Sequence, residues 1–452
     1  MMTSHDNRLK RREFLQKSVA GAALAGLVIV PRHVLGGAEH TPPSEKVNLA
    51  CIGVGNRGWQ LVQGMQHHNI VALCDVDEKY LAKASERYPN ARKYHDFRKL
   101  LDWEENNIDA VVVATPDHVH VPATMMAMKM GKHCYTEKPL GHNVHEVREA
   151  TRVADRYGLA TQLGNTGHSS QIYRSVVELI RAGTIGEVRE VHAWCDNEWE
   201  SPPRAAAGDG SRRGRDRPQG TPPVPAHLDW DLWLGPAPYR PYHPTYHPVQ
   251  WRGWWDFGNG RLGDMGCHLI DLPFTALDLR YPLTIEADGP PAHPESAPPW
   301  LISKWTFPAR GDRPPVELTW YDGNKRPELL KEVDAPDSKY PWYVLLVGAE
   351  GMLIAGMDTF RLYPEEKFAG VRRPRLPQAP SHADQWLAAC KTGTPTGTHF
   401  GYSGPLTETV LLGTVAYRAG QKLQWDAENL KVTNCPEAET FIRRAYRQGW
   451  TL

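Results

Sequence analysis

The sequence lacks several features that mark specialised protein classes. Its seven cysteines are scattered without a CxxC pair, which argues against a zinc knuckle, a redox dithiol and a disulfide-stapled scaffold. Basic and acidic residues balance at 52 each, whereas a nucleic-acid binder usually carries a basic excess. Beyond the N-terminal region no run of 18 apolar residues occurs, so we expect no membrane span in the mature chain. The sequence therefore favours a globular protein, soluble or merely anchored, with no nucleic-acid partner.

Phenylalanine is scarce compared with the other aromatic residues. The chain has 9 Phe against 16 Trp and 17 Tyr, so rings that carry a polar group predominate. Such rings suit flat, hydroxyl-rich ligands, although each one can equally fill a core or loop contact. With 452 residues, of which 41% are hydrophobic, the chain is long enough and apolar enough to bury a sizeable core.

Residues 1–38 have the pattern of an export signal. A basic start with an arginine pair at 11–12 precedes Phe-Leu at 14–15, an apolar run at 19–30 and small residues at 36–38. The run is too short to cross a membrane as a helix, which needs about 20 residues. The arginine pair resembles a twin-arginine signal, and an ordinary amphipathic helix is the alternative. We expect export, already folded, to the periplasm or another extracytoplasmic compartment.

A glycine-rich turn follows the first expected strand of the globular region. Residues 46–52 form a short apolar run, and Gly53, Gly55 and Gly58 follow in the pattern G-x-G-x-x-G before a helical stretch at 59–66. A dinucleotide-binding turn requires this strand–turn–helix context. Gly53 permits the tight turn, Gly55 lets backbone amides approach a pyrophosphate, and Gly58 lets the helix pack close to the strand.

An acidic residue follows the second expected strand. Residues 70–74 are apolar and lead into Asp75, about 20 residues beyond the glycine turn, where a dinucleotide site places its ribose-binding carboxylate. Such a carboxylate accepts hydrogen bonds from the ribose and repels a 2′-phosphate, so we expect NAD rather than NADP. Asp77 is a nearby competitor for this role. Asn56 and Arg57, inside the turn, belong to the same predicted site.

The alternation of strands and helices continues to a second cluster of polar residues. The apolar run at 108–114 fits a central parallel strand, and Thr115-Pro116 closes it at the end where ligands bind in open α/β sheets. His118 and His120 open the next helix, and we place all four residues in the cofactor site. Neither a carboxylate nor a cysteine at a supporting spacing joins the two histidines, so we expect no metal.

The next strand pattern, at 131–136, ends in Glu137-Lys138-Pro139, the most specific of several motifs that match one known family. From about residue 46 to its end, the chain resembles the Gfo/Idh/MocA oxidoreductases, which include glucose–fructose oxidoreductase and inositol dehydrogenase. The resemblance rests on residues 53–58, Asp75, 115–120, 137–139, 162–165, 180–188, 263–268 and 412–426.

The resemblance implies an α/β protein with two domains. Residues 45–165 would form an NAD-binding Rossmann domain, and 166–452 an α/β domain with a large open, mainly antiparallel sheet. Homo-oligomers, dimers or tetramers, are implied across the exposed face of that sheet. The stretch at 199–255, rich in aromatic residues, Pro, Gly and Arg, breaks the pattern as an insertion. It would arch over the active site or reach into a neighbouring subunit, and its four arginines at 212–217 fit a solvated loop.

Three residues are our candidates for catalysis. Hydride transfer from an alcohol needs a base for the hydroxyl proton and groups that orient the substrate. The resemblance assigns catalysis to Lys138, adds a cis bond to Pro139, and places Glu137 and Lys138 at the cofactor. Asp264 and His268 lie one helical turn apart, on one face of a helix. We favour His268 as base or relay and Lys138 as orienting cation, with the reverse open; Asp271 would orient the imidazole or merely pair on the helix.

Substrate contacts are expected from two further segments. Asn165 and His168 follow a strand that should reach the cleft, and both types of side chain suit sugar hydroxyls. Trp254 and Trp255 directly precede the catalytic helix, where a ring could stack on a pyranose or simply pack.

Three functions fit these residues. The leading interpretation is an exported NAD-dependent oxidoreductase that transfers hydride between a sugar ring carbon and a tightly held nicotinamide cofactor. The alternative is an NAD-dependent glycosidase, similar to the α-N-acetylgalactosaminidase branch of the family, which oxidises the sugar transiently and recycles NAD. A non-catalytic sugar-binding relative is the third, and the presence of Lys138, Asp264 and His268 together argues against it.

Overall fold

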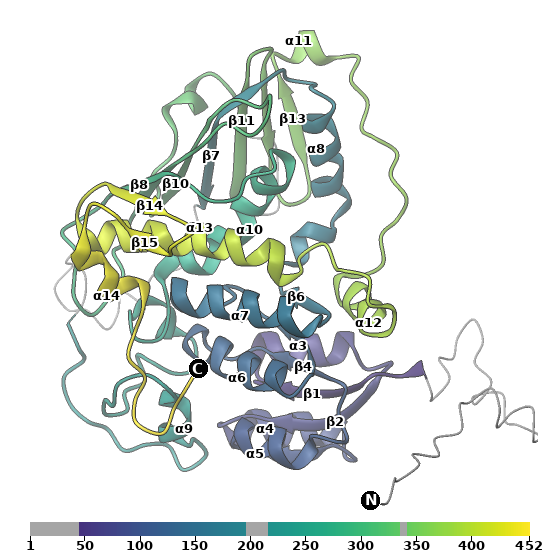
Figure 1. Ribbon diagram of the computed structural model, residues 1–452, viewed down its shortest axis with the longest axis vertical. Helices are drawn as coiled ribbons and strands as arrows, with labels where there is room; N and C mark the ends of the chain where they lie inside the picture. The colour runs from purple at the N-terminus through teal and green to yellow at the C-terminus, as the bar shows by residue number, and fades with distance from the viewer. Residues whose placement is uncertain (1–44, 196–215, 335–340) are drawn as a thin grey trace, which may run out of the picture. The chain divides into compact units, whose positions relative to one another are not determined.

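Two sheets organise the chain, one in each half of the sequence (Figure 1). The computed structural model describes residues 45–195, 216–334 and 341–452. The predicted export signal at 1–38 and most of the arginine cluster at 212–217 lie outside the described residues. Val47–Leu452 form one compact unit, so contacts between the two sheets and their helices belong to a single body.

The first sheet is a six-stranded parallel sheet in the order β3-β2-β1-β4-β5-β6. Its strands are β1 (Asn48–Ile52), β2 (Asn69–Cys74), β3 (Arg92–Tyr94), β4 (Ala110–Val113), β5 (His133–Thr136) and β6 (Thr161–Leu163). Every residue of β4 is buried, as expected for a central strand with helices on both faces. The strand order reverses between β1 and β4, so a ligand crevice is expected at their carboxyl ends.

Five helices connect these strands. They are α3 (Asn56–Gly64), α4 (Glu78–Arg87), α5 (Phe97–Glu104), α6 (Asp117–Lys129) and α7 (Val144–Tyr157). Local signals set their ends: Asp77 caps α4 by accepting a hydrogen bond from the Lys79 amide, and Asn143 caps α7 through the Glu146 amide. Helix α7 stops at Gly158, which has a left-handed backbone (φ 60°).

The second sheet is mixed and mostly antiparallel, with the order β13-β12-β11-β7-β10-β9-β8-β14-β15. The pair β7–β10 is parallel, and the other pairs are antiparallel. Its strands are β7 (Val188–Cys195), β8 (Thr284–Asp288), β9 (Ile302–Phe307), β10 (Val316–Asp322), β11 (Trp342–Gly348), β12 (Met352–Ala355), β13 (Phe360–Tyr363), β14 (Leu423–Asp426) and β15 (Lys431–Val432). The two sheets confirm the predicted α/β class.

Further helices follow β6, and some of the helices lie between the two sheets (Figure 1). The longer ones after β6 are α8 (Gln171–Arg181), α10 (Gly260–Ala276), α12 (His382–Thr392) and α13 (Phe400–Ala419); the short ones are α9 (Trp230–Leu234), α11 (Glu365–Phe368), α14 (Glu439–Ile442) and the 3₁₀ turns at Thr166–Ser169, Gln250–Gly253, Glu328–Lys331 and Pro436–Ala438. Helix α13 packs against both α7 and α10. Arg148 of α7 forms two buried hydrogen bonds of 2.7 and 2.6 Å to the carboxylate of Glu408 on α13, which join the halves.

The described part of the insertion, from residue 216 onward, has a small aromatic core of its own. Trp230, Trp233, Tyr246, Trp254 and Phe257 are all buried there and contact one another. The segment lies against the Rossmann domain: the Glu78 amide donates to the carbonyl of His227 at 2.8 Å, and the Asp229 amide donates to that of Val76 at 2.9 Å.

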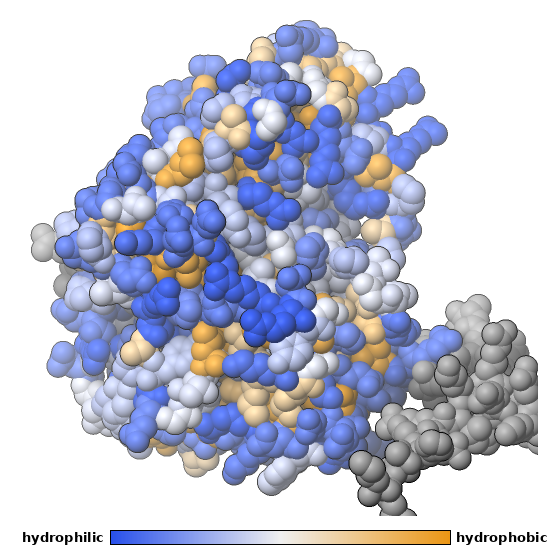
Figure 2. Space-filling model, in the orientation of Figure 1, coloured by the Kyte–Doolittle hydropathy of each residue, from blue (hydrophilic) through white to orange (hydrophobic). Residues whose placement is uncertain are grey.

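Three further features concern the length and polarity of the helices, the cysteines and the surface. None of the described helices is both long and apolar enough to cross a membrane. None of the seven cysteines, which all lie in the described residues, is in a disulfide bond. On the face shown in Figure 2, hydrophilic residues predominate and hydrophobic ones appear in scattered areas between them.

Candidate active site

A large cleft opens at the carboxyl ends of β1, β2, β4 and β5, with a volume of about 1170 Å³. Sites for drug-sized ligands usually measure about 300–1,000 Å³, so this cleft has room for a dinucleotide. Of the residues predicted for the site, it is lined by Gly53, Gly55, Asn56, Arg57, Asp75, Thr115, Pro116, His120, Glu137, Lys138, Asp264 and His268. The start of α10 and part of the insertion complete the lining.

The glycine turn has the geometry that a dinucleotide needs. Gly53 has a left-handed backbone (φ 80°), and a Cβ atom there would lie 2.6 Å from the carbonyl oxygen of Ala114. A Cβ on Gly58 would lie 1.9 Å from the Gly53 oxygen, so only glycine allows α3 to pack this close to β1. Gly55 precedes α3, and no side chain caps the helix. The first backbone amides of α3 therefore suit a pyrophosphate.

Asp75 and Asp77 have different tasks. The carboxylate of Asp75 lines the cleft and accepts hydrogen bonds from the amides of Val54 and Asp77, both at 2.9 Å. Burial raises its pKa to about 6. Asp77 instead accepts from Nδ1 of His227 at 2.9 Å and Nε2 of His247 at 3.0 Å, and so fastens the insertion to the start of α4. Of the two carboxylates, Asp75 is the one that lines the cleft.

Two contacts join the ends of neighbouring strands. Arg57, in the glycine turn, donates to Oε1 of Glu137 at 2.8 Å. The ring nitrogens of His120 lie 2.8 Å from the Thr115 carbonyl oxygen and 2.7 Å from that of Pro139. These contacts fix the Thr-Pro and Glu-Lys-Pro segments side by side at the cleft.

Lys138 and Asp264 meet in the lining of the cleft. Nζ of Lys138 donates to Oδ1 of Asp264 at 2.6 Å and to its backbone oxygen at 2.7 Å, and the Lys138–Pro139 bond is cis. Arg252 also donates to Oδ1, at 3.1 Å. Burial opposes ionisation of Asp264, but the two cations outweigh it and hold its pKa well below the usual range. Asp264 is therefore a carboxylate that positions two cations.

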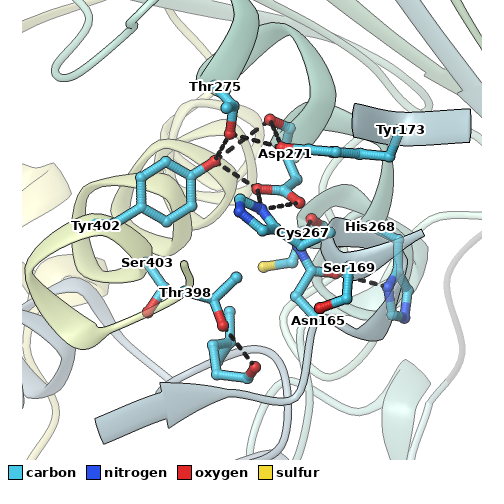
Figure 3. A network of polar contacts seen from close by, with 12 residues as sticks. Asn165, Ser169, Tyr173, Cys267, His268, Asp271, Thr275, Thr398, Tyr402 and Ser403 are labelled. Atoms are coloured by element: carbon cyan, nitrogen blue, oxygen red, sulfur yellow. Dashed lines mark hydrogen bonds and ion pairs between the residues drawn. The ribbon is translucent and has the colours of Figure 1, made fainter. Parts of the chain in front are cut away.

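His268 is held in one tautomer. Asn165 donates through Nδ2 to the carbonyl of Cys267 at 2.9 Å, so its Oδ1 faces Nδ1 of His268 at 2.8 Å (Figure 3). An amide oxygen only accepts, so Nδ1 carries the proton and Nε2 has a free lone pair. Burial, assisted by the charge of Lys138, lowers the pKa of His268 to about 3. The imidazole is thus neutral and able to accept a proton.

A second polar network surrounds Asp271, which lies about one helical turn beyond His268 on α10 (Figure 3). The buried carboxylate of Asp271 accepts from the hydroxyl of Tyr402 and from Nδ1 of His168 at 3.0 Å, while the Tyr173 hydroxyl donates to the Asp271 carbonyl at 3.0 Å. Asp271 therefore pairs with His168 and does not orient His268. His168 lies in this network and not on the lining of the large cleft, contrary to our expectation that it contacts substrate.

Four more predicted positions need correction. His118 was expected at the cofactor, but its buried ring packs on Trp233 and Phe257, because residues two apart on a helix point to opposite sides. Trp254 and Trp255 are buried in packing contacts away from the cleft lining. Asn165 is also fully buried and acts on His268, not on the cleft.

Several cleft residues were not predicted from the sequence. Asp117 directly follows Thr115-Pro116, and its position at the end of a strand could have predicted its place in the cleft. Arg252 and Trp251 lie in the insertion, where no motif marks them, and both line the cleft. In the described ranges no group of three or more His, Cys, Asp or Glu side chains could hold a metal ion.

The two sheets define an α/β protein whose first sheet is Rossmann-like, with a cleft at its carboxyl end. Two family models match: "Oxidoreductase family, NAD-binding Rossmann fold" over residues 47–165, and "Oxidoreductase family, C-terminal alpha/beta domain" over residues 214–311. These two matches confirm the predicted resemblance to the Gfo/Idh/MocA oxidoreductases.

Individual relatives are more distant. The α-N-acetylgalactosaminidase of Shewanella oneidensis is 28% identical over 209 residues, which are 40% of this chain and 45% of that protein. The chain thus matches less than half the length of this curated relative. Among solved structures, GenD2 from gentamicin A biosynthesis, in complex with NAD, has a TM-score of 0.58 at 18% identity and covers 88% of this chain and 100% of its own. The WlbA dehydrogenase of Bordetella pertussis, in complex with NADH and UDP-GlcNAcA, also has a TM-score of 0.58, at 15% identity, covering 84% of this chain and 99% of its own.

Proposed function

We propose that the protein is an NAD-dependent oxidoreductase that acts on a ring hydroxyl carbon of a sugar or sugar derivative. One observation carries this proposal: Lys138, Asp264 and a neutral His268 line the same cleft as the glycine turn. A binding protein would need neither the proton acceptor nor the paired cation.

The residues around the cleft fit NAD. The uncapped start of α3 and the turn around Gly55 suit the pyrophosphate, and Asp75 suits the ribose and disfavours a 2′-phosphate. When bound, NAD supplies the hydride acceptor. The insertion also borders the cleft through Trp233 and the segment 247–253, which supports slow release of the cofactor.

The side chains divide the chemistry among themselves. Nε2 of His268 takes the proton of the substrate hydroxyl, since Asn165 keeps the proton of the ring on Nδ1. Lys138 donates a hydrogen bond to the same oxygen and stabilises negative charge that develops there. Asp264 holds the ammonium in place. Arg252 restrains the other side of Asp264.

The test measures bound nucleotide first and then NADH formation with sugars. Purified protein is denatured and the supernatant is assayed for NAD(H), then intact protein is offered a panel of free sugars with added NAD. We expect released nucleotide and an absorbance rise from NADH that is absent in His268→Ala. Sugar binding without any NADH from the panel, by wild-type protein that binds NAD, would contradict the proposal.

A glycosidase that recycles its cofactor is the second candidate. The alignment with the Shewanella α-N-acetylgalactosaminidase supports it, and it would use the same three side chains. The discriminating assay offers nitrophenyl glycosides without added nucleotide. Release of nitrophenol without net NADH favours the glycosidase, and NADH accumulation with free sugars favours the dehydrogenase.

Export and self-association complete the proposal. The twin arginines at 11–12 support export of the folded, cofactor-loaded protein to the periplasm or another extracytoplasmic compartment. Replacing both with lysine should retain the protein in the cytoplasm, which cell fractionation measures. The family resemblance supports a dimer or tetramer, which light scattering on the purified protein tests.

A further inference from the structure

Asp117 is a buried carboxyl group of the cleft that the proposed chemistry does not use. It is the first residue of α6, directly after Thr115-Pro116 at the end of β4, and only 4% of it is exposed. It lines the cleft, yet no side chain in the described residues donates a hydrogen bond to its carboxyl group. Its own backbone amide hydrogen-bonds to it, but a buried carboxylate that lacks side-chain donors is still costly, so such a group either keeps a proton or awaits a ligand.

The charged groups that face Asp117 come from three other segments. They are Asp264 on α10, Arg252 in the turn before it, and Lys138 after β5. Both cations donate their hydrogen bonds to Asp264, which therefore takes the single negative charge of the cluster. On its own helix, His118 and His120 are neutral, because burial lowers the pKa of each.

Asp117 consequently holds a proton at neutral pH. Burial, with a further contribution from the charge of Asp264, raises its pKa to about 8 against the pull of Arg252 and Lys138. Any ligand that brings another positive charge to this end of the cleft would favour the ionised form and release that proton.

We propose that Asp117 matches the charge of the oxidised cofactor: it is protonated in the free protein and ionises when the cationic nicotinamide of NAD⁺ binds beside Lys138 and Asp264. This inference rests on the proposed function, which places the nicotinamide at that end of the cleft. The proton leaves the carboxyl oxygen for solvent, and no bond to the cofactor forms. The reduced ring of NADH is uncharged, so its binding leaves Asp117 protonated. The residue thus favours NAD⁺ over NADH.

Calorimetry in buffers of different ionisation enthalpy tests this directly, because it counts protons released on binding. With the full chain freed of nucleotide at pH 7, we expect release of about one proton per NAD⁺ and none per NADH. Asp117→Asn has the same shape without the charge, and should release none with either nucleotide and bind NAD⁺ about tenfold more weakly relative to NADH. Asp102→Asn, at an exposed aspartate of α5, should behave as wild type.

A second variant guards against misfolding at position 117. In Asp264→Asn, Arg252 and Lys138 lose their carboxylate, so Asp117 should already be ionised and NAD⁺ binding should release no proton. Infrared difference spectra of the wild type should show a protonated carboxyl band that disappears with NAD⁺ and persists with NADH. Equal proton release by wild type and Asp117→Asn would overturn the inference while the proposed function stands. If wild type binds neither nucleotide, the proposed function itself fails.

Discussion

Nδ1 of His268 donates a 2.8 Å hydrogen bond to Oδ1 of Asn165, and the Asn165 amide is itself oriented by the Cys267 carbonyl. A backbone oxygen on the catalytic helix thereby selects which nitrogen of the imidazole meets the cleft. The tautomer of the proposed base is a property of the fold and does not depend on the ligand.

The first prediction concerns this hydrogen bond. Asn165→Asp should keep a hydrogen-bond acceptor at Nδ1 but add a negative charge, which raises the pKa of His268 from about 3. A protonated ring cannot accept the hydroxyl proton, so activity should be lost as the pH falls through the raised pKa. The pH profile of kcat/KM should show an acid limb shifted upward by at least one unit, whereas wild type stays flat there. An unshifted limb would remove His268 from the role of base.

Lys138→Met should remove the cation at the reacting oxygen while it preserves most of the packing. We expect kcat to fall about 100- to 10,000-fold, the usual range for a positioned proton-handling or charge-stabilising group. Lys79→Met, at an exposed lysine of α4, is the matched control. A variant that retains more than a tenth of the activity would exclude an essential role for Lys138.

Asp75→Ser should change which cofactor binds. Without the carboxylate, the ribose hydroxyls lose an acceptor and a 2′-phosphate loses a repulsive charge. We expect NAD to bind about tenfold more weakly and NADP correspondingly more tightly. Titration of intrinsic fluorescence with each nucleotide measures both. If the preference for NAD survives intact, another residue must read the ribose.

Removal of one partner of the buried pair between α7 and α13 should destabilise the protein. In Arg148→Met, Glu408 is left buried without its two hydrogen bonds, which typically costs about 3–5 kcal/mol. Arg152→Met breaks an exposed pair on the same helix and should cost less than about 1 kcal/mol. Denaturant unfolding gives both values, and the double variant Arg148→Met/Glu408→Leu should recover most of the loss.

The contact of Asp77 with two histidines should govern release of the cofactor. In Asp77→Asn the amide still caps α4 but holds His227 and His247 less firmly, so the insertion should open more often. We expect NAD to dissociate several-fold faster, measured by trapping with excess labelled NAD, with unchanged thermal stability of the sheets. An unaltered dissociation rate would show that the insertion does not hold the nucleotide.

Most of the fold and part of the site could be predicted from the sequence. Periodic apolar runs and the glycine turn predict the parallel sheet, because each strand and its turn are encoded locally. The sequence could not show that Asp75 and Asp77 have different roles, because the histidines that bind Asp77 come from the distant insertion. Asn165 and Trp254 were misplaced for a similar reason: the side of the backbone to which each points depends on long-range packing.

His118 and Asp117 show a different limit. A helix that begins at a strand end presents one face to the cleft, and the first residue, not the second, lies on that face here. Sequence spacing gives the angle between neighbours but leaves the rotation of the helix undetermined. The contacts of the His118 ring with Trp233 and Phe257 show that rotation.

The histidines that grip Asp77 lie 150 and 170 residues further along the chain. During synthesis, the Rossmann sheet emerges long before the segment that covers its ribose end, and contacts between such distant positions form late. A nucleotide that settles on the nascent sheet would therefore be enclosed as the rest of the polypeptide arrives. Assembly of the holoprotein would then be coupled to folding.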